Sequence, residues 1–356
     1  MKKILVINPF GIGDVIFTMT AVEALRSAVP QARVDFLCNE RTRDLARLNA
    51  SIDQTFVFSR DEFRGDLARG PFVFLRKLGG FLSLLRRQGY DTAFDFSLGR
   101  EVGFFAWLIG IPKRIGFDFK GRGNFLTHRK KIEGYEGKHA VEWQLSLLES
   151  FGIPCRRVSA RLPLRISAEA RRAAEAFLGD RGILEGDTVL AVAPGGGKSW
   201  GKDAVYKQWG ADRFAEAIGE TLKRRPAKAV LLGAAEEKAL LSEVASRLGV
   251  SAPVAAGAPL ETVCAILLRS TALFCNDGGL LHLANALGVK TVSVFGPVDP
   301  RVYGPYGNQA PHEALVEDVP CRPCYRRFHF PPCRYERRCL DRLRPEKAVA
   351  ALEKMI

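Results

Sequence analysis

Two glycine-containing turns hold the side chains best suited to chemistry. The first, Asn8-Pro9-Phe10-Gly11-Ile12-Gly13-Asp14, follows a short apolar run and places Asp14 at the mouth of a predicted helix. A carboxylate in such a position can deprotonate an acceptor hydroxyl when desolvation raises its pKa. Aspartate is also a common helix N-cap, and Asp14 can serve in both roles.

The second turn contains Asp277, Gly278 and Gly279 and joins an apolar run that ends at Cys275 to another predicted helix. The free N–H groups and the dipole of a helix N-terminus bind phosphate, and glycines let a diphosphate approach the backbone. His282, further along this helix, adds a hydrogen-bond donor. Taken alone, Asp277 could be a helix cap and His282 could be an ordinary core histidine. Taken together with the two glycines, these residues indicate a diphosphate site.

Two common nucleotide-binding motifs are incomplete. Ile16 occupies the position of the third glycine of a dinucleotide-binding turn, which argues against a nicotinamide site. Val192 stands where a Walker A motif has its leading glycine, so Gly195-Gly196-Gly197-Lys198-Ser199 is not interpreted as a P-loop. The two turns described above therefore remain the candidate functional elements.

The elements around these turns alternate short β-branched runs with longer amphipathic stretches, as in βα units on parallel sheets. In the first half, the expected strands are Lys3–Ile7, Arg33–Leu37, Gln54–Phe58, Asp91–Phe94 and Arg114–Gly116. The expected helices there are Val15–Val29, Phe72–Gln88 and Ala140–Phe151. In the second half, the expected strands are Thr188–Ala193, Ala229–Leu232, Ala272–Phe274 and Thr291–Phe295. The expected helices there are Asp212–Lys223, Glu236–Leu248, Leu260–Arg269 and Gly279–Leu287.

Residues 153–166 contain two prolines and no long periodic pattern, so we place a domain boundary in this segment. The predicted domains are residues 1–160, which would bind the acceptor, and residues 161–356, which would bind the nucleotide. The predicted fold class is α/β, with two doubly wound, Rossmann-like domains that face one another across a cleft. Ligands of such sheets bind beyond the carboxyl ends of the strands, where both candidate turns are expected.

The composition excludes several classes of protein. A chain of 356 residues that is 47% hydrophobic and has no low-complexity tract is globular rather than disordered. Its longest apolar run, Val102 to Ile111, is about half of the ~20 residues that a membrane-spanning helix needs. The N-terminal apolar stretch stops at Asn8 and lacks a small-residue cleavage site, so we interpret it as the first strand of a cytosolic protein.

The net charge of +14, from 53 basic and 39 acidic side chains, needs an explanation. Most clusters of basic residues lie in the first half, and they lack both a recognised nucleic-acid module and interleaved aromatic residues. Nucleic acid is therefore not predicted as a partner. An anionic membrane surface, a phosphorylated substrate and an ordinary solvated surface all remain compatible with these clusters.

Four of the eight cysteines lie close together near the C-terminus, namely Cys321, Cys324, Cys333 and Cys339. Because no secretory leader is visible, the spacing C-x2-C-x8-C-x5-C favours a structural zinc or iron site over disulfides, with reduced thiols as an equal alternative. The six arginines between Arg322 and Arg338 could lower the pKa of these thiols or bind an anionic acceptor. The other four cysteines, Cys38, Cys155, Cys264 and Cys275, are expected to be buried apolar groups.

Two longer runs that include the candidate turns resemble a known family. G-D-V-I-F-T-M-T-A-V-E-A-L-R (13–26) is similar to the opening motif of the ADP-heptose lipopolysaccharide heptosyltransferases, glycosyltransferase family nine. N-D-G-G-L-L-H-L-A-N-A-L-G-V-K-T-V-S-V-F-G-P-V-D-P (276–300) is similar to their nucleotide-binding motif. Between these motifs, two shorter runs fall in the family's order, K-Q-W-G-A-D-R-F-A-E-A (207–217) and L-L-G-A-A-E-E (231–237), and the closing R-P-E-K-A-V-A-A-L (344–352) also fits. The resemblance covers nearly the whole chain.

The resemblance implies a GT-B fold, inverting transfer from a nucleotide diphosphate sugar, and no cofactor or metal for catalysis. It matches Asp14 to the base that takes the acceptor proton, and Lys207 to the lysine that holds the donor phosphates, although lysines in general are mostly exposed. Glu237 is matched to the ribose-binding acid, with the adjacent Glu236 as an alternative. The remaining matched residues are Asp277, Gly278, Gly279 and His282 at the donor diphosphate, and Gly11 and Gly13 in the loop on the acceptor side.

On this resemblance we predict an enzyme that moves heptose from ADP-L-glycero-D-manno-heptose to a lipopolysaccharide inner-core acceptor. Its expected partners are the donor, an anionic glycolipid acceptor and a membrane surface, and its expected location is the cytoplasm, at the inner face of the bacterial inner membrane. One alternative is transfer of another activated sugar, or transfer to a protein or another glycan. A further alternative is a nucleotide-binding module without turnover. Gly278 stands where the family usually has Ser or Thr, so a backbone N–H is expected to replace a hydroxyl contact.

Overall fold

The computed structural model describes residues 1–59, 65, 68–155, 158–197 and 201–356, except for the side chain of Lys202. The chain forms two compact units. The first consists of Met1–Tyr135 and Ala140–Ser159, and the second consists of Glu136–His139 and Ala160–Ile356. Whereas the sequence suggested a single break near residue 160, the four residues Glu136–His139 also belong to the second unit.

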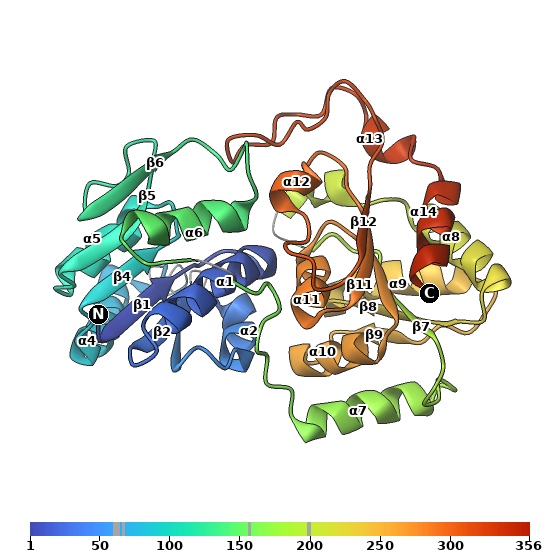
Figure 1. Ribbon diagram of the computed structural model, residues 1–356, viewed down its shortest axis with the longest axis horizontal. Helices are drawn as coiled ribbons and strands as arrows, with labels where there is room; N and C mark the ends of the chain where they lie inside the picture. Colours follow the sequence, from blue (N-terminus) through green and yellow to red (C-terminus); the bar gives the residue numbers. More distant parts are fainter. Residues whose placement is uncertain (60–64, 66–67, 156–157, 198–200) are drawn as a thin grey trace. The chain divides into compact units, whose positions relative to one another are not determined.

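The first unit contains a six-stranded parallel sheet in the order β3-β2-β1-β4-β5-β6 (Figure 1). Its strands are β1 (Lys3–Ile7), β2 (Arg33–Cys38), β3 (Gln54–Val57), β4 (Thr92–Asp95), β5 (Lys113–Phe119) and β6 (His128–Ile132). Its described helices are α1 (Ile12–Ala28), the short η1 (Glu40–Thr42), α2 (Arg43–Leu48), α4 (Pro71–Gln88), α5 (Arg100–Leu108) and α6 (Ala140–Ser150). The strand order reverses between β1 and β4, which makes their carboxyl ends the expected ligand position.

Helices cover both faces of this first sheet. On one face, Leu85 of α4 and Ala106 of α5 join a buried cluster with Leu5 and Ala93 of the strands. Successive side chains of a strand point to opposite faces, so Phe94 points away from that cluster. α6 covers the opposite face together with α1 (Figure 1), and there the ring of Phe94 contacts that of Phe151 just after α6, with centroids 6.0 Å apart.

The second unit contains another six-stranded parallel sheet, in the order β12-β11-β10-β7-β8-β9. Its strands are β7 (Val189–Ala193), β8 (Lys228–Gly233), β9 (Val254–Ala256), β10 (Ala272–Asn276), β11 (Lys290–Val294) and β12 (His312–Leu315). Its helices are α7 (Ala168–Gly179), η2 (Gly201–Lys207), α8 (Ala211–Arg224), η3 (Ala235–Glu237), α9 (Lys238–Arg247), α10 (Leu260–Arg269), α11 (Gly279–Leu287), α12 (Pro300–Tyr303), α13 (Arg338–Asp341) and α14 (Pro345–Met355). Here the order reverses between β7 and β10.

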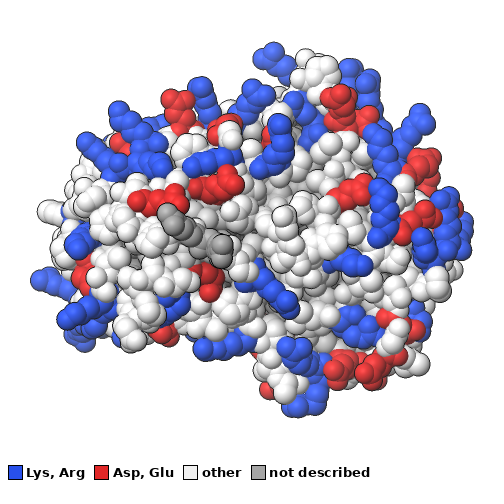
Figure 2. Space-filling view, in the orientation of Figure 1, with Lys and Arg blue, Asp and Glu red and all other residues white. Residues whose placement is uncertain are grey.

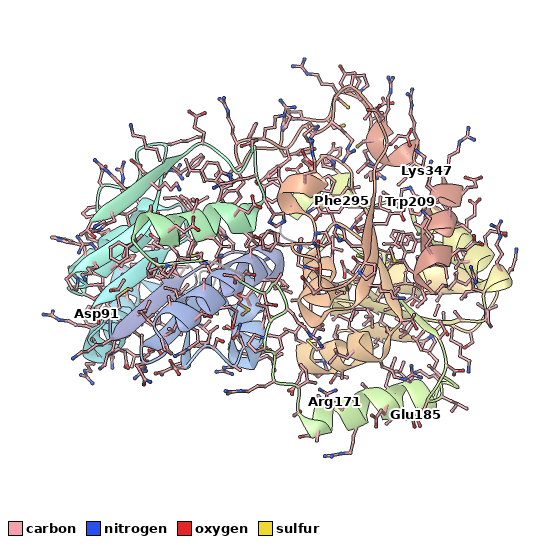
Figure 3. All side chains as sticks on the ribbon, in the orientation of Figure 1. Asp91, Arg171, Glu185, Trp209, Phe295 and Lys347 are labelled. Carbon is pink, nitrogen blue, oxygen red and sulfur yellow. The ribbon has the colours of Figure 1, made fainter. Side chains whose placement is uncertain are left out.

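Three aromatic side chains pack together within the largely aliphatic core of the second unit. Trp209, labelled in Figure 3, is 1% exposed, and its ring lies 5.3 Å from that of Phe214. The rings of Phe214 and Phe274 lie 4.6 Å apart, so α8 is fixed against the central strand β10. Phe274 is two residues from the end of β10, and this packing therefore anchors the turn that follows the strand.

The predicted α/β class with two doubly wound units is confirmed by these sheets. Within the described residues, no helix is both long and apolar enough to cross a membrane.

Candidate functional site

Asn276 ties together the loops at the carboxyl edge of the second sheet. It is the last residue of β10 and is 1% exposed. Its side-chain amide donates to the carbonyl oxygen of Pro194, just after β7, at 2.6 Å. Its Oδ1 accepts from the backbone N–H of Trp209 at 3.0 Å. Three segments distant in sequence therefore meet where the strand order reverses.

Lys207 and Asp277 form a buried ion pair at this edge. Lys207 Nζ lies 2.8 Å from Asp277 Oδ2, and the two side chains are 9% and 5% exposed. The alternative of a solvent-exposed Lys207 is therefore wrong. The alternative of Asp277 as a helix cap is also wrong, because Gly278 is the N-cap of α11. Burial of two charges is costly unless they are paired, so each side chain requires the other.

The N-terminus of α11 is open for an anion. The helix begins at Gly279, and no side chain caps its first N–H groups. A Cβ atom added to Gly278 would lie 3.6 Å from the carbonyl oxygen of Gly196, so the turn after β10 lies beside the loop after β7. Uncapped N–H groups and the helix dipole favour phosphate at this position.

His282 lies on α11 and is 5% exposed. Burial, followed by the charges of Lys207 and His139, lowers the pKa of His282 to about 3. The imidazole is therefore neutral at physiological pH, and its capacity to donate one hydrogen bond does not change between pH 5 and 9. His282 is both a buried histidine and a member of the cluster, so the two roles considered for it are compatible.

His139 is a neighbour of this cluster that the sequence analysis did not single out. It belongs to the Glu136–His139 segment of the second unit and is 8% exposed. Its Nε2 lies 2.9 Å from the carbonyl oxygen of Gly304, and its ring centroid lies 4.8 Å from that of Tyr306. No motif surrounds His139 in the sequence, and only the fold reveals that its charge influences His282.

Glu237 lies over the glycine loop that follows β7. Its Oε2 accepts from the N–H of Ala234 at 2.9 Å, and its Oε1 accepts from the N–H of Gly197 at 3.3 Å. A Cβ atom added to Gly195 would lie 2.1 Å from Glu237 Oε1, so a side chain at this position would displace the Glu237 carboxylate. Glu237 is half-buried whereas Glu236 is exposed, which favours Glu237 of the two candidates.

The loop containing Gly195 to Gly197 is the element of this site that the sequence analysis set aside. Its glycines fail the Walker A spacing, yet their backbone contacts both Glu237 and the turn at Gly278. Three consecutive glycines, separated from a buried strand by Pro194 alone, were the available signal. Lys198 and Ser199, which follow, lie outside the described residues.

In the first unit, Asp14 lies in the first turn of α1. The helix begins at Ile12 with Gly11 as its N-cap, so Asp14 is the third helical residue and not the cap. Gly13 precedes it within the same turn. Asn8, which is 1% exposed, donates to the carbonyl oxygen of Asp14 at 3.1 Å and to Thr18 Oγ1 at 2.7 Å. Asn8 therefore holds the end of β1 against α1 and positions a half-buried carboxylate.

Asp95 is a second carboxyl group at this sheet edge. It ends β4 and pairs in register with Ile7, the last residue of β1. Burial raises the pKa of Asp95 to about 6, although hydrogen bonds from Ser97 act in the opposite direction. Gly116 of β5 packs against it, because an added Cβ atom would lie 2.8 Å from the Asp95 carbonyl oxygen. Nothing in the sequence distinguishes Asp95 from the other strand-end aspartates.

Asp95→Asn is expected to stabilise the protein at neutral pH. Because folding raises the pKa of Asp95, the contribution of this carboxyl group to stability is most favourable below about pH 4, becomes less favourable as the pH rises to about 6, and stays at that lower level above it. The shift corresponds to at most about 3 kcal/mol. Asparagine has no charge to bury and can still accept from Ser97, so the variant should melt at a higher temperature at pH 7.5 and match the wild type at pH 4.

Asp91→Asn is the matched control for this prediction. Asp91, labelled in Figure 3, lies just before β4, and its carboxylate accepts from the N–H groups of Lys2 and Lys3. Burial raises its pKa, but hydrogen bonds from Thr92, Lys2 and Lys3 outweigh burial and lower it. This second variant should therefore be destabilised at pH 7.5. A melting temperature of Asp95→Asn below that of the wild type at pH 7.5 would contradict the argument.

The four cysteines of the C-terminal segment are free thiols, of which Cys339 is buried and the others are half-buried. Burial raises the pKa of Cys339 to about 11 and also raises that of Cys324, and it outweighs the opposing charge of Arg322. Arg322 does act in the expected direction on both thiols, but burial has the larger effect and the net shift of the pKa is upward. Arg322 also donates to the carbonyl oxygens of Gly296 and Val298.

Among the described residues, no three His, Cys, Asp or Glu side chains are arranged to hold a metal ion. The side chains of Cys321, Cys324, Cys333 and Cys339 therefore do not fit a bound ion in the arrangement seen here. The structural zinc or iron site stays a prediction, and no chemistry is assigned to it.

Comparisons with known proteins identify the family and the fold. The model of glycosyltransferase family 9 (heptosyltransferase) matches residues 80–330. Lipopolysaccharide heptosyltransferase 1 of Pseudomonas aeruginosa is 25% identical over 380 residues, which cover 99% of this chain and 98% of the relative.

Two solved structures share the fold. A glycosyltransferase family 9 protein from Veillonella parvula superposes with a TM-score of 0.79 at 22% identity, over 99% of this chain and 97% of that one. The ADP-heptose lipopolysaccharide heptosyltransferase II of Escherichia coli superposes with a TM-score of 0.75 at 19% identity, over 100% and 98% of the two chains. The GT-B fold class expected from the sequence is thereby confirmed.

Proposed function

The chain belongs to glycosyltransferase family 9, and on that premise we propose that this glycosyltransferase moves heptose from ADP-L-glycero-D-manno-heptose to a lipopolysaccharide inner-core acceptor. The observation that carries the proposal is the buried Lys207–Asp277 pair beside the uncapped N-terminus of α11. Relatives named as lipopolysaccharide heptosyltransferases support the choice of sugar and acceptor.

The second unit supplies what the leaving group needs. As the bond between the sugar and the diphosphate breaks, negative charge grows on the departing oxygen, and fixed positive charge and N–H groups stabilise it. Lys207 and the first N–H groups of α11 supply both without a metal ion. Gly278 and Gly279 carry no side chain that would block the approach of the two phosphates. Neutral His282 can donate one further hydrogen bond from the same helix.

Asp14 acts as the general base in this proposal. It takes the proton from the acceptor hydroxyl while that oxygen attacks the anomeric carbon and the nucleoside diphosphate leaves from the opposite face, which inverts the configuration. The tie from Asn8 to the first turn of α1 supports this role, because a base must be held in place to act efficiently. Glu237 is assigned to the ribose of the donor.

A lipid-linked acceptor places the reaction at the cytoplasmic face of the bacterial inner membrane in this proposal. The excess of basic residues, 53 against 39 acidic ones, supports an anionic acceptor and an anionic membrane surface. Figure 2 shows Lys and Arg side chains in excess along the outer margin of the first unit.

Calorimetry with ADP-, UDP- and GDP-linked sugars tests the donor class directly. We expect ADP-heptose to bind with a Kd in the micromolar range and at least tenfold more tightly than a UDP- or GDP-sugar, a difference of about 1.4 kcal/mol. A preference for UDP or GDP would replace the proposed donor with another activated sugar. Binding without any turnover in the presence of an acceptor extract would identify a nucleotide-binding module instead of an enzyme.

A further inference from the structure

Helix α4 exposes an unusual number of large apolar side chains. The 18-residue helix packs on the first sheet through Leu85, but its first turn leaves Phe72 78% exposed and Leu75 61% exposed. Val73 and Leu84 are also exposed, at 41% and 46%. A soluble surface rarely concentrates such residues without a partner.

The same surface of α4 is basic and contains no acidic residue from Pro71 to Gln88. Arg76, Arg86 and Arg87 are exposed, and none of the salt bridges within the described residues involves them. The spacing of an α-helix puts four of its residues on one face, namely Phe72, Arg76, Ser83 and Arg87. Apolar and basic groups therefore share one outward surface.

The middle of this outward surface has no side chains and is not covered by other parts of the described structure. Gly79 and Gly80 lie between the apolar first turn and the arginines at the end of the helix. A Cβ atom added to either glycine would meet nothing within 4 Å. The backbone of α4 can therefore lie close to a broad, flat partner, which suits a bilayer better than a narrow groove-filling peptide.

The direction of α4 places its apolar end at the same edge of the first sheet as the proposed base. α4 connects the parallel strands β3 and β4, so it runs back across the sheet and begins at the carboxyl edge. Asp14, in the first turn of α1, lies at that same edge. Phe72 and Leu75 are therefore at the end of the first unit where an acceptor hydroxyl would be deprotonated.

We propose that the outward surface of α4 binds an anionic lipid bilayer, with Phe72 and Leu75 entering the interface and Arg76, Arg86 and Arg87 contacting lipid phosphates. An amphipathic helix of this composition gains binding both from buried apolar area and from attraction to anionic headgroups. This inference rests on the proposed function, because it explains how a lipid-anchored acceptor reaches the carboxyl edge of the first sheet.

Sedimentation with vesicles tests the proposal on the full chain. Vesicles of phosphatidylglycerol and phosphatidylcholine should bind the wild-type protein, and pure phosphatidylcholine should bind it far more weakly. Phe72→Ser with Leu75→Ser is expected to reduce binding about tenfold. Arg76→Gln with Arg86→Gln and Arg87→Gln is expected to reduce it roughly 100-fold at low salt, since each basic residue near an anionic surface adds about fivefold.

The matched control is Leu184→Ser with Val250→Ser, which removes apolar side chains that are 63% and 51% exposed in the second unit. This control should bind vesicles as the wild type does. Thermal melting verifies that every variant is folded, and transfer to a delipidated, water-soluble acceptor should be unchanged in all of them. If the wild-type protein transferred no sugar to the soluble acceptor, the proposed function would be contradicted. The vesicle-binding result would still test membrane binding by α4 on its own.

Four outcomes would overturn the proposal. The first is that the α4 variants bind anionic vesicles as tightly as the control does. The second is that the wild type and all variants bind neutral and anionic vesicles equally. The third is that the wild-type protein self-associates in solution and the α4 variants do not, which would identify a second copy of the chain as the partner. An effect seen only with detergent-dispersed acceptor, and not with vesicles, would identify the acceptor's own lipid as the ligand.

Discussion

Asp14→Asn should lower the rate of sugar transfer by about 10³-fold while changing donor affinity by less than about twofold, because a general base contributes roughly this factor and the donor is assigned to the other unit. Asparagine preserves the size of the side chain and leaves the backbone bond from Asn8 to residue 14 in place. Only the capacity to accept a proton is lost. The measurements are kcat with a fixed acceptor and Kd for ADP-heptose by calorimetry.

Asp44→Asn is the control for this substitution. Asp44 is an exposed carboxylate in the first turn of another helix of the same unit, α2. Its replacement should leave both kcat and Kd unchanged. If Asp14→Asn retained more than a tenth of the wild-type rate, the assignment of the base would be wrong. If it lost donor binding as well, Asp14 would have to be reassigned to the donor site.

Lys207→Met should have two separable effects, one on stability and one on donor binding. Removal of the ammonium group leaves the buried Asp277 carboxylate without its ion partner, which should destabilise the protein by about 3 kcal/mol. It also removes the charge assigned to the donor diphosphate, which should weaken donor binding by roughly 100-fold. Urea unfolding measures the first effect and calorimetry the second.

The double variant Lys207→Met with Asp277→Asn separates the two roles. It removes both charges of the pair and leaves no unpaired buried carboxylate. Most of the lost stability should therefore return, because a buried ion pair contributes little net stability relative to two neutral side chains. Donor affinity should remain low, since no ammonium group is available for the phosphates. Recovery of donor binding in the double variant would show that Lys207 only neutralises Asp277 and does not contact the donor.

Elements with fully buried apolar runs were predictable from the sequence. The strand Lys3–Ile7 and the helices Leu260–Arg269 and Gly279–Leu287 have the predicted bounds, since glycines or polar residues mark their ends and burial selects their apolar composition. Parallel sheets buried on both faces leave an unusually clear pattern. The fold class followed from that pattern alone.

The strands that were missed lie at sheet edges. β6, β9 and β12 are edge strands, and β6 has the sequence H-R-K-K-I, in which the charged side chains obscure the pattern of a strand. α5 falls in the longest apolar run and has too few polar residues to show helical periodicity. Periodicity identifies an element by the contrast between its two faces, and these segments have little contrast.

The site was predictable in its turns but not in its pairings. Lys207 and Asp277 were both named from the sequence, yet only the fold shows that they neutralise each other. Gly11 takes the cap position that was considered for Asp14, because the helix begins earlier than its apolar pattern does. His139 and Asp95 gave no local signal, since their significance depends on burial and on neighbours distant along the chain.

The assignment of Glu136–His139 to the second unit bears on how the chain can be divided for engineering. The polypeptide passes between the two units three times, after Tyr135, His139 and Ser159. A fragment cut at residue 160 would carry His139 away from Gly304 and Tyr306, and would leave the C-terminal fragment without that imidazole. Chimeras that exchange donor specificity with a relative should therefore transplant this tetrapeptide together with residues 160–356.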